Sequence, residues 1–429
     1  MTGLLRPVTA LLLSASILMM GNGLFGVLIP IRASIEQFAS YDIGVMGSVH
    51  FAGLMIGCLL WPRVIATVGH IRAFAALTAL VTITPLAHAI WTVPPVWWVL
   101  RGLNGLFFAG LFMIIESWLT GASQPDTRGR ILGAYAMTNL TVVTGGMLLV
   151  SVGEPASFEL FSLVTILYSL AAVPIALTPR SAPQPPPTAK MRLGWLIAVS
   201  PAAVFGCFAA GIVNSGFWTF SPLFAQGGGL SVRDAALFMS LAVLGGALSQ
   251  WPIGRLSDQW GRRAVGIVVS TVAATAGIAL YLFADRGAPV LFTLGVLYGS
   301  MAFTVYTLCV AHANDLVHRK RAVEVSSGLL LVFSAGAILG PMMASTMMQV
   351  MGHGGLFLHT AIAHASIAVV MLLRAQVRPK LPTRHKEAFV LVPRTTPAVF
   401  ELDPRGEPSP VPPTEAQPPA VSPAETPSR

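Results

Sequence analysis

The amino-acid sequence predicts an all-α integral membrane protein with twelve transmembrane helices in two six-helix halves. Of its 429 residues, 54% are hydrophobic and only 10% are charged, whereas a soluble domain carries about a quarter charged residues. Uncharged apolar runs of about 20 residues, enough to cross a bilayer, recur along most of the chain. A proline-rich segment near the middle, Pro179 to Arg192, separates six of these runs from six more.

Charges, prolines and glycine-rich turns bound the expected spans. The first run follows Arg6 and is longer than the about 7 to 15 apolar residues of a signal peptide, so we interpret it as a retained helix. The first six spans are predicted near residues 8–31, 43–62, 73–93, 96–119, 131–152 and 158–178. The second six are predicted near 196–222, 234–254, 264–284, 288–311, 324–350 and 356–373.

Four segments follow from these spans: an N-terminal half (1–178), a cytoplasmic inter-half linker (179–195), a C-terminal half (196–374) and a cytoplasmic tail (375–429). The tail has no long apolar run and carries 13 of the 32 prolines. A segment of that composition does not build a core of its own, so we expect it to be disordered.

The distribution of basic residues predicts the orientation of the chain. With the N-terminus inside, nineteen Lys and Arg residues fall in inner loops or near the end of the last span, against Arg32, Arg233 and Arg286 outside. The positive-inside rule therefore places both termini in the cytoplasm. It also explains the net charge of +9, so we expect a lipid bilayer and not nucleic acid as the partner of these charges.

The loop between the eighth and ninth spans is Gly254-Arg255-Leu256-Ser257-Asp258-Gln259-Trp260-Gly261-Arg262-Arg263. Its glycines allow a tight turn, and its arginines suit an anionic membrane face. The pattern resembles the G-x-L-x-D-x-x-G-R-R signature of the major facilitator superfamily. The resemblance implies two pseudo-symmetric halves and a gating loop formed by Gly254, Asp258, Gly261, Arg262 and Arg263.

A second copy of this loop is expected after the second span. Aligning Gly69 with Gly261, 192 residues later, places Ala66 at the position of Asp258. The first copy therefore lacks the acidic residue, and the halves need not be equivalent in gating. An ordinary positive-inside loop explains the same segment equally well.

The fourth span contains two charged residues, Arg101 and Glu116, and intramembrane charges are candidates for function. They lie about 22 Å apart along one helix, so they cannot pair. In the superfamily this helix lines the central cavity, and Arg101 with Gly105 matches its R-x-x-x-G pattern. Glu116 is either a proton-coupling carboxylate or a structural acid held by Arg128 or Arg130.

On the tenth span, the counterpart of the fourth, His312 is a second candidate for proton coupling, although it also suits the membrane interface. Cavity-lining residues are expected on the first, fourth, seventh and tenth spans: Asn22, Arg101, Asn104, Asn214, Trp218 and Tyr306. Asn139 on the fifth span is interpreted as an interhelical packing contact.

Other patterns are interpreted as helix packing. Gly21-Asn22-Gly23-Leu24-Phe25-Gly26 has dinucleotide-binding spacing but lies inside an apolar span, and Gly53-x-x-x-Gly57 and Gly336-x-x-x-Gly340 suit close helix approach. The three cysteines lie in apolar runs, and no nucleophile with a base or metal-ligand cluster occurs. We therefore expect no catalytic residues, cofactor or metal.

Two longer stretches resemble the bacterial YcaD-like branch of the superfamily: Arg101 through Glu116-Ser117 and Arg128-Gly129-Arg130 to Tyr135, and Gln250 through Asp258 to Arg262. The resemblance implies a monomeric secondary transporter of a small organic solute in the bacterial inner membrane, working by alternating access with proton coupling. Efflux is preferred over uptake; the fifth span lacks the Gly-Pro antiporter pattern, and the eleventh has Gly336-x-x-x-Gly340-Pro341. The alternative is a membrane sensor or scaffold with this fold that signals through the tail.

Overall fold

The computed structural model describes residues 2–123, 127–177, 192–318, 321–377, 389–390 and 393–403. In these ranges all regular structure is helical, and twelve segments are long and apolar enough to cross a membrane. The predicted fold class is thereby confirmed. Most of the predicted linker and tail lies outside the described residues.

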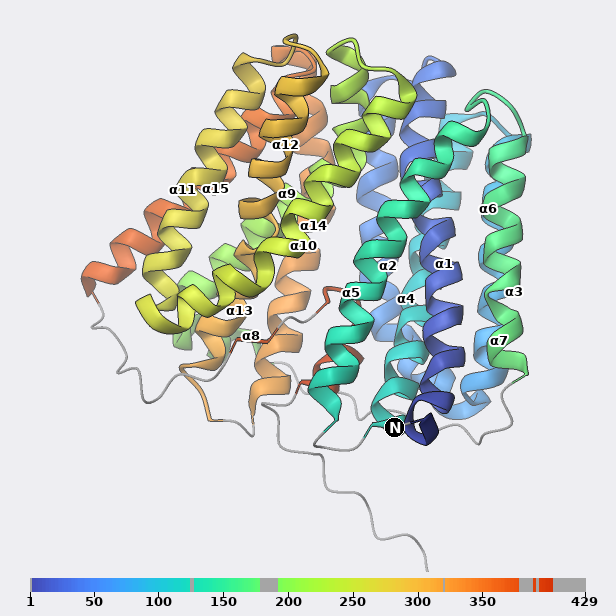
Figure 1. Cartoon of the computed structure of the whole chain (residues 1–429), viewed down its shortest axis with the longest axis horizontal. Coiled ribbons are helices and arrows are strands. Elements are labelled where there is room, and N and C mark those ends of the chain that lie inside the picture. The colour runs from blue at the N-terminus through green and yellow to red at the C-terminus, as the bar shows by residue number, and fades with distance from the viewer. Residues whose placement is uncertain are drawn as a thin grey trace, which may run out of the picture.

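Two groups of helices lie side by side (Figure 1). The N-terminal half consists of α1 (Thr2–Ile35), α2 (Ser40–Val68), α3 (His70–Ile90), α4 (Pro94–Ala122), α5 (Arg128–Leu148), η1 (Leu149–Val152), α6 (Glu159–Leu170) and α7 (Ala172–Ala176). The C-terminal half consists of α8 (Leu193–Val199), α9 (Pro201–Gly227), α10 (Val232–Trp260), α11 (Arg262–Leu282), α12 (Ala288–Ala302), α13 (Val305–Asn314), α14 (Ala322–Met351) and α15 (Gly355–Val377). A short 3-10 helix, η4 (Pro397–Leu402), follows in the tail.

The glycines aligned between the halves adopt the same unusual backbone conformation. Gly69 has φ +88° and Gly261 has φ +102°, values that favour glycine, and a new helix begins at the next residue in both cases. The loop after α2 is therefore the structural counterpart of the loop after α10. Its weaker sequence match reflects the missing acid and not a different turn.

The Gly-x-x-x-Gly pairs are helix contacts, as predicted. A Cβ atom on Gly336 or Gly340 of α14 would collide with a backbone carbonyl oxygen of α9, and one on Gly53 of α2 with a carbonyl oxygen of α4. Small residues allow this approach without a side chain between the helices. The pairs α9–α14 and α2–α4 are accordingly among the most closely packed in the protein.

We call the face on which α1 begins and α15 ends the terminal face. The two halves touch near the opposite face, where Gly47 of α2 lies against α9 and α14: an added Cβ would be 2.8 Å from Pro341. Across the second contact, between α5 and α10, the hydroxyl of Ser240 donates to the carbonyl of Thr144 at 3.3 Å. These contacts close the opposite face.

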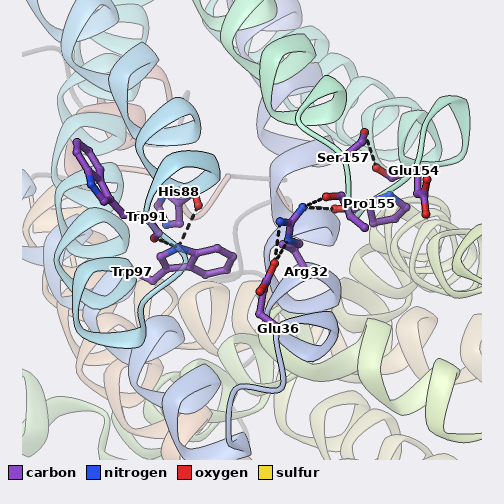
Figure 2. Close-up of polar contacts among 9 residues, drawn as sticks. Arg32, Glu36, His88, Trp91, Trp97, Glu154, Pro155 and Ser157 are labelled. Carbon is purple, nitrogen blue, oxygen red and sulfur yellow. Dashed lines mark hydrogen bonds and ion pairs between the residues drawn. The ribbon is translucent and has the colours of Figure 1, made fainter.

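Polar contacts also fix the helix ends on the opposite face (Figure 2). Arg32, at the end of α1, forms an ion pair with Glu36 at 2.7 Å and donates to the carbonyl of Pro155 at 3.2 Å, which joins α1 to the loop before α6. The indole N–H of Trp97 donates to the carbonyl of Trp91 at 2.7 Å, which holds the α3–α4 turn. Arg32 thus stabilises the contact between α1 and this loop, and it does not line the cavity described below.

Candidate functional site

A cavity of about 320 Å³ lies between the two halves. Its wall comes from α1, α2, α4 and α5 of one half and from α9, α10, α13 and α14 of the other, together with Phe303 between α12 and α13 and a tail segment. Polar and aromatic groups of this wall include Asn22, His50, Arg101, Asn139, Asn214, Trp218, Gln250, Phe303, Thr307 and Phe333. A cavity with walls from both halves can change its exposure when the halves move relative to each other.

Four of the six predicted cavity residues line this wall: Asn22, Arg101, Asn214 and Trp218. Asn104 does not, because it is fully buried between α4 and α3, where its amide donates to the hydroxyl of Thr84 at 3.1 Å. Tyr306 lies one layer behind the wall, with its ring 5.0 Å from that of Phe333. Asn139, interpreted from sequence as a packing residue, does line the cavity.

The part of the wall near Arg101 carries unused hydrogen-bonding capacity. The guanidinium lies 5.5 Å from the ring of Phe25, and its Nε has no hydrogen-bond partner among the described residues. Nδ1 of His50, which lies on α2 in the same cavity wall, also has no hydrogen-bond partner in the part of the chain that the structure describes. Buried polar atoms are usually satisfied, so a ligand or water is the natural partner for both.

A break in the tenth span forms another part of the wall. The predicted span 288–311 is divided into α12 and α13 at Phe303 and Thr304, and Phe303 faces the cavity. Gln250 of α10 supports the break: its amide donates to the Phe303 carbonyl at 3.0 Å, and its oxygen accepts from Thr307 at 2.8 Å. Broken helices of this kind occur where transporters bind their solutes.

Glu116, the predicted proton-coupling acid, is completely buried near the terminal end of α4. The hydroxyl of Tyr135 donates to Oε1 at 3.1 Å, and the hydroxyls of Thr395 and Thr396 donate to Oε1 and Oε2. Among the described residues it is therefore hydroxyl groups, and not Arg128 or Arg130, that hold this carboxylate.

The two threonines belong to the tail, which differs here from the disorder expected from its composition. Residues 393–395 line the cavity, and η4 packs on α4 and α5 of one half and on α14 of the other. The segment is drawn in red between the two halves (Figure 1). Because η4 contacts α4, α5 and α14, it lies between the two halves.

The tail also contacts the predicted gating loop. The backbone N–H of Phe389 donates to Oδ2 of Asp258 at 3.1 Å, and the Phe389 ring fills the space in which Gly254 would have a Cβ. Asp258 pairs in addition with Arg262 at 2.5 Å, and Arg262 pairs with Asp315 of the same half at 3.1 Å. Asp258, the acidic residue of the predicted gating loop, thus contacts Arg262 of the same loop and Phe389 of the tail.

His312 and Arg263, the other two candidates from this region, lie beside each other. Nε of Arg263 is 3.4 Å from Nε2 of His312. His312 is 5% exposed and lies outside the cavity wall. The position suits the interface histidine that was the second interpretation of this residue.

The sequence profile of the Major Facilitator Superfamily matches residues 11–341 and 229–417 of the chain. The uncharacterized MFS-type transporter YcaD of Escherichia coli O17:K52:H18 (strain UMN026) is 29% identical over 386 residues, which cover 89% of this chain and 98% of YcaD. YcaD of Escherichia coli O45:K1 (strain S88) is equally similar, with 29% identity over 89% of this chain and 98% of its own length.

Solved structures of transporters share the fold. The nucleoside transporter NupG superposes with a TM-score of 0.73 at 14% identity, covering 86% of this chain and 98% of its own. A bacterial homologue of the human lysosomal transporter Spinster, in an inward-facing and occupied conformation, gives 0.70 at 16% identity, covering 89% and 97%. The D-xylose–proton symporter gives 0.65 at 15% identity, covering 89% and 100%.

Proposed function

The chain belongs to the Major Facilitator Superfamily, in its YcaD-like branch, and we propose that it moves a small organic solute across the bacterial inner membrane by alternating access. As a member of this family it is a secondary transporter and not an enzyme. Proton coupling, the efflux direction and action as a monomer are further parts of the proposal. The cavity between the halves carries it, because its wall combines helices from both halves with unsatisfied polar atoms of Arg101 and His50.

The conformation supports alternating access with the terminal face as the open end. The halves are in contact near the opposite face, through Gly47 with Pro341 and Ser240 with Thr144, whereas near the terminal face the tail lies between them. We propose that the terminal face is cytoplasmic, because the sequence assigns nineteen basic residues to the same side of the membrane as the N-terminus and three to the other side. The conformation would then be inward-facing.

Glu116 is the residue we propose for proton coupling. Its carboxylate is buried in the half that contains Arg101, and the two tail threonines cover it on the terminal side. Movement of the tail would give this carboxylate access to water on the terminal face while leaving Tyr135 in place. A carboxyl group that alternates between a dry and a wet environment can bind and release a proton in each cycle.

Glu116→Gln is expected to abolish the effect of a pH gradient on transport. The amide keeps the size and hydrogen-bonding capacity of the carboxyl but cannot release a proton. Proteoliposomes would be loaded with a mixture of small organic solutes, and their release would be measured by mass spectrometry with and without an imposed gradient. We expect at least about a tenfold stimulation by the gradient in the unmodified protein and none in the variant, while downhill release continues.

Glu159→Gln, at an exposed glutamate on the opposite face, is the matched control and should behave as the unmodified protein. Gradient-independent release by the unmodified protein, or coupling that survives in Glu116→Gln, would show that the proton-coupling assignment is wrong. Absence of flux for every solute, together with loss of a cellular response on removal of the residues after Lys386, would favour the sensor instead.

A further inference from the structure

The side chain of Arg394 lies in a cage of three aromatic rings. Its guanidinium carbon is 5.9 Å from the ring centre of Phe303, 5.7 Å from that of Tyr306 and 5.7 Å from that of Phe333. Ring faces attract cations, and a set of several rings is a recognition site for organic cations. Two of these rings also belong to the cavity wall.

No carboxylate is needed to explain the position of this guanidinium. Burial lowers the pKa of Arg394 to about 10, which still leaves the group cationic at neutral pH. One of its terminal nitrogens, Nη1, is buried and has no hydrogen-bond partner among the described residues. The three rings therefore contact the cation while at least one of its N–H groups has no acceptor among the described residues, so the cage can accept cations of other shapes.

The two residues that follow Arg394 contact the carboxylate of Glu116. The hydroxyls of Thr395 and Thr396 donate to the two oxygens of Glu116. Along three consecutive residues the tail thus presents one organic cation to an aromatic cage and two hydrogen-bond donors to a carboxylate. The cage belongs to the C-terminal half and the carboxylate to the N-terminal half.

We propose that residues 393–396 of the tail occupy part of the solute site, and that the site takes an organic cation carrying hydrogen-bond donors. The proposal deepens the proposed function and rests on it. The cation of the solute replaces Arg394 between the rings, and its hydroxyl or amino groups replace the threonines at Glu116. The tail is then an internal competitor of the solute.

The charges around the cage favour a cation over an anion. Once the tail leaves, the carboxyl group of Glu116 loses both threonine donors, and in its ionised form it would repel an anionic solute in surroundings of low dielectric constant. Arg101 is the cationic group that would attract an anion, and it lies about 22 Å from Glu116 along α4. The cage and the carboxylate together therefore select a positively charged solute that carries hydrogen-bond donors.

Displacement of the tail would also free the terminal face. Helix η4 follows Thr396 directly and packs on α4, α5 and α14, so it joins the two halves. A solute that takes the place of Arg394 and the threonines removes the polar and cation–π contacts beside η4, so only the packing of Val399, Phe400 and Leu402 still holds the helix. Binding of the right cation thereby weakens the link between the two halves and favours their movement.

The test uses Ala398 in η4, which is 4% exposed while the segment is docked. In the full-length Ala398→Cys variant in nanodiscs, the rate of maleimide labelling reports release of the segment. The probes are arginine amide and citrulline amide, which differ in a cationic guanidinium against a neutral urea. We expect arginine amide to accelerate labelling at least about tenfold, and citrulline amide to leave it within about twofold.

Controls define both limits of the measurement. The unmodified chain gives the background from its three native cysteines, and Ala66→Cys, at an exposed alanine near the end of α2, gives the unprotected rate. Adding Arg394→Gln to the reporter removes the cation and should bring labelling close to the unprotected rate. Adding Phe333→Leu should weaken the response to arginine amide.

Three results would overturn the proposal. Labelling at the unprotected rate without any probe, in Ala398→Cys and in a second reporter at buried Val399, would mean that the segment is not docked. Acceleration by Arg394→Gln but not by arginine amide would mean that the cage is no solute site. Equal acceleration by both amides would remove the selection for cations.

Labelling does not depend on flux, so the two proposals fail separately. Release of the segment by arginine amide, with no transport of any solute, would keep the cation site and contradict the transporter. Proton-coupled transport of neutral or anionic solutes, with no release by cations, would keep the transporter and contradict the solute class.

Discussion

Replacing Arg262 with methionine is expected to lower the free energy of unfolding by about 3 to 5 kcal/mol, since removal of one partner from a buried ion pair has effects of that size. The Arg262 side chain is 2% exposed and lies 2.5 Å from Asp258 and 3.1 Å from Asp315, which is itself 3% exposed. It also donates to the hydroxyl of Ser257 at 2.8 Å. The measurement is thermal or denaturant unfolding of the purified protein in detergent.

Arg255→Met is the matched control, because Arg255 belongs to the same loop but is exposed and only lies over the ring of Trp251 at 5.2 Å. Its effect should remain within about 0.5 kcal/mol, as for most surface substitutions. A double-mutant cycle with Asp315→Asn then isolates the interaction between Arg262 and Asp315. Equal losses in the two methionine variants would contradict a structural role for the buried ion pair.

The second large effect is expected for Gly336→Ala. The new methyl group would collide with the carbonyl oxygen of Phe208 and lie 2.9 Å from its carbonyl carbon, so α14 and α9 would have to separate. Overpacking of this kind costs about 1 to 3 kcal/mol, and we expect the upper end because the obstacle is backbone. Unfolding midpoints in detergent measure the loss.

Gly145→Ala supplies the contrast, since no atom lies within 4 Å of a Cβ built on Gly145 in α5. This variant should be neutral or more stable by less than about 1 kcal/mol, because alanine loses less backbone freedom than glycine on folding. Destabilisation of the same size in both variants would mean that the loss at Gly336 arises from helix propensity or membrane insertion and not from the α9–α14 contact.

The sequence predicted the spans well because the physical signal is strong and local. A bilayer requires long uncharged runs, and charges or prolines end them. The two loops at Gly69 and Gly261 were also recognisable, since a positive φ directly between two helices demands a particular residue. Arg101 could be placed in the cavity wall because a charged side chain within a membrane span almost always faces the bundle interior or a water-filled cavity. His50 could have been found by the same argument.

The orientation of uncharged polar residues was harder to predict. Asn104 follows Arg101 by three residues and so lies about 60° away around the helix, which is enough to turn it from the cavity toward Thr84 of α3. Asn139 was assigned to packing but lines the cavity. Sequence gives the depth of such residues in the membrane, but their direction depends on how neighbouring helices pack.

The docked tail segment could not be predicted from composition. The proline content indicates that the tail builds no core of its own, but the buried side chains of Val399, Phe400 and Leu402 use a core that the helix bundle provides. The apolar groups after Pro397 and the cation at Arg394 were the available signals. They acquire meaning only when the cage and Glu116 are known to lie opposite them.

The docked segment and the cavity that it fills are parts of one polypeptide, since α15 ends at Val377 and residues 393–403 follow in the same chain. A ligand tethered by a short connection is present at an effective concentration on the order of millimolar. Docking is thus a first-order process, and the fraction of docked molecules does not depend on how many copies the membrane contains. A competing solute has to exceed a threshold concentration set by the chain itself, so the protein would respond to accumulation of the solute and would keep its tail docked when only traces are present.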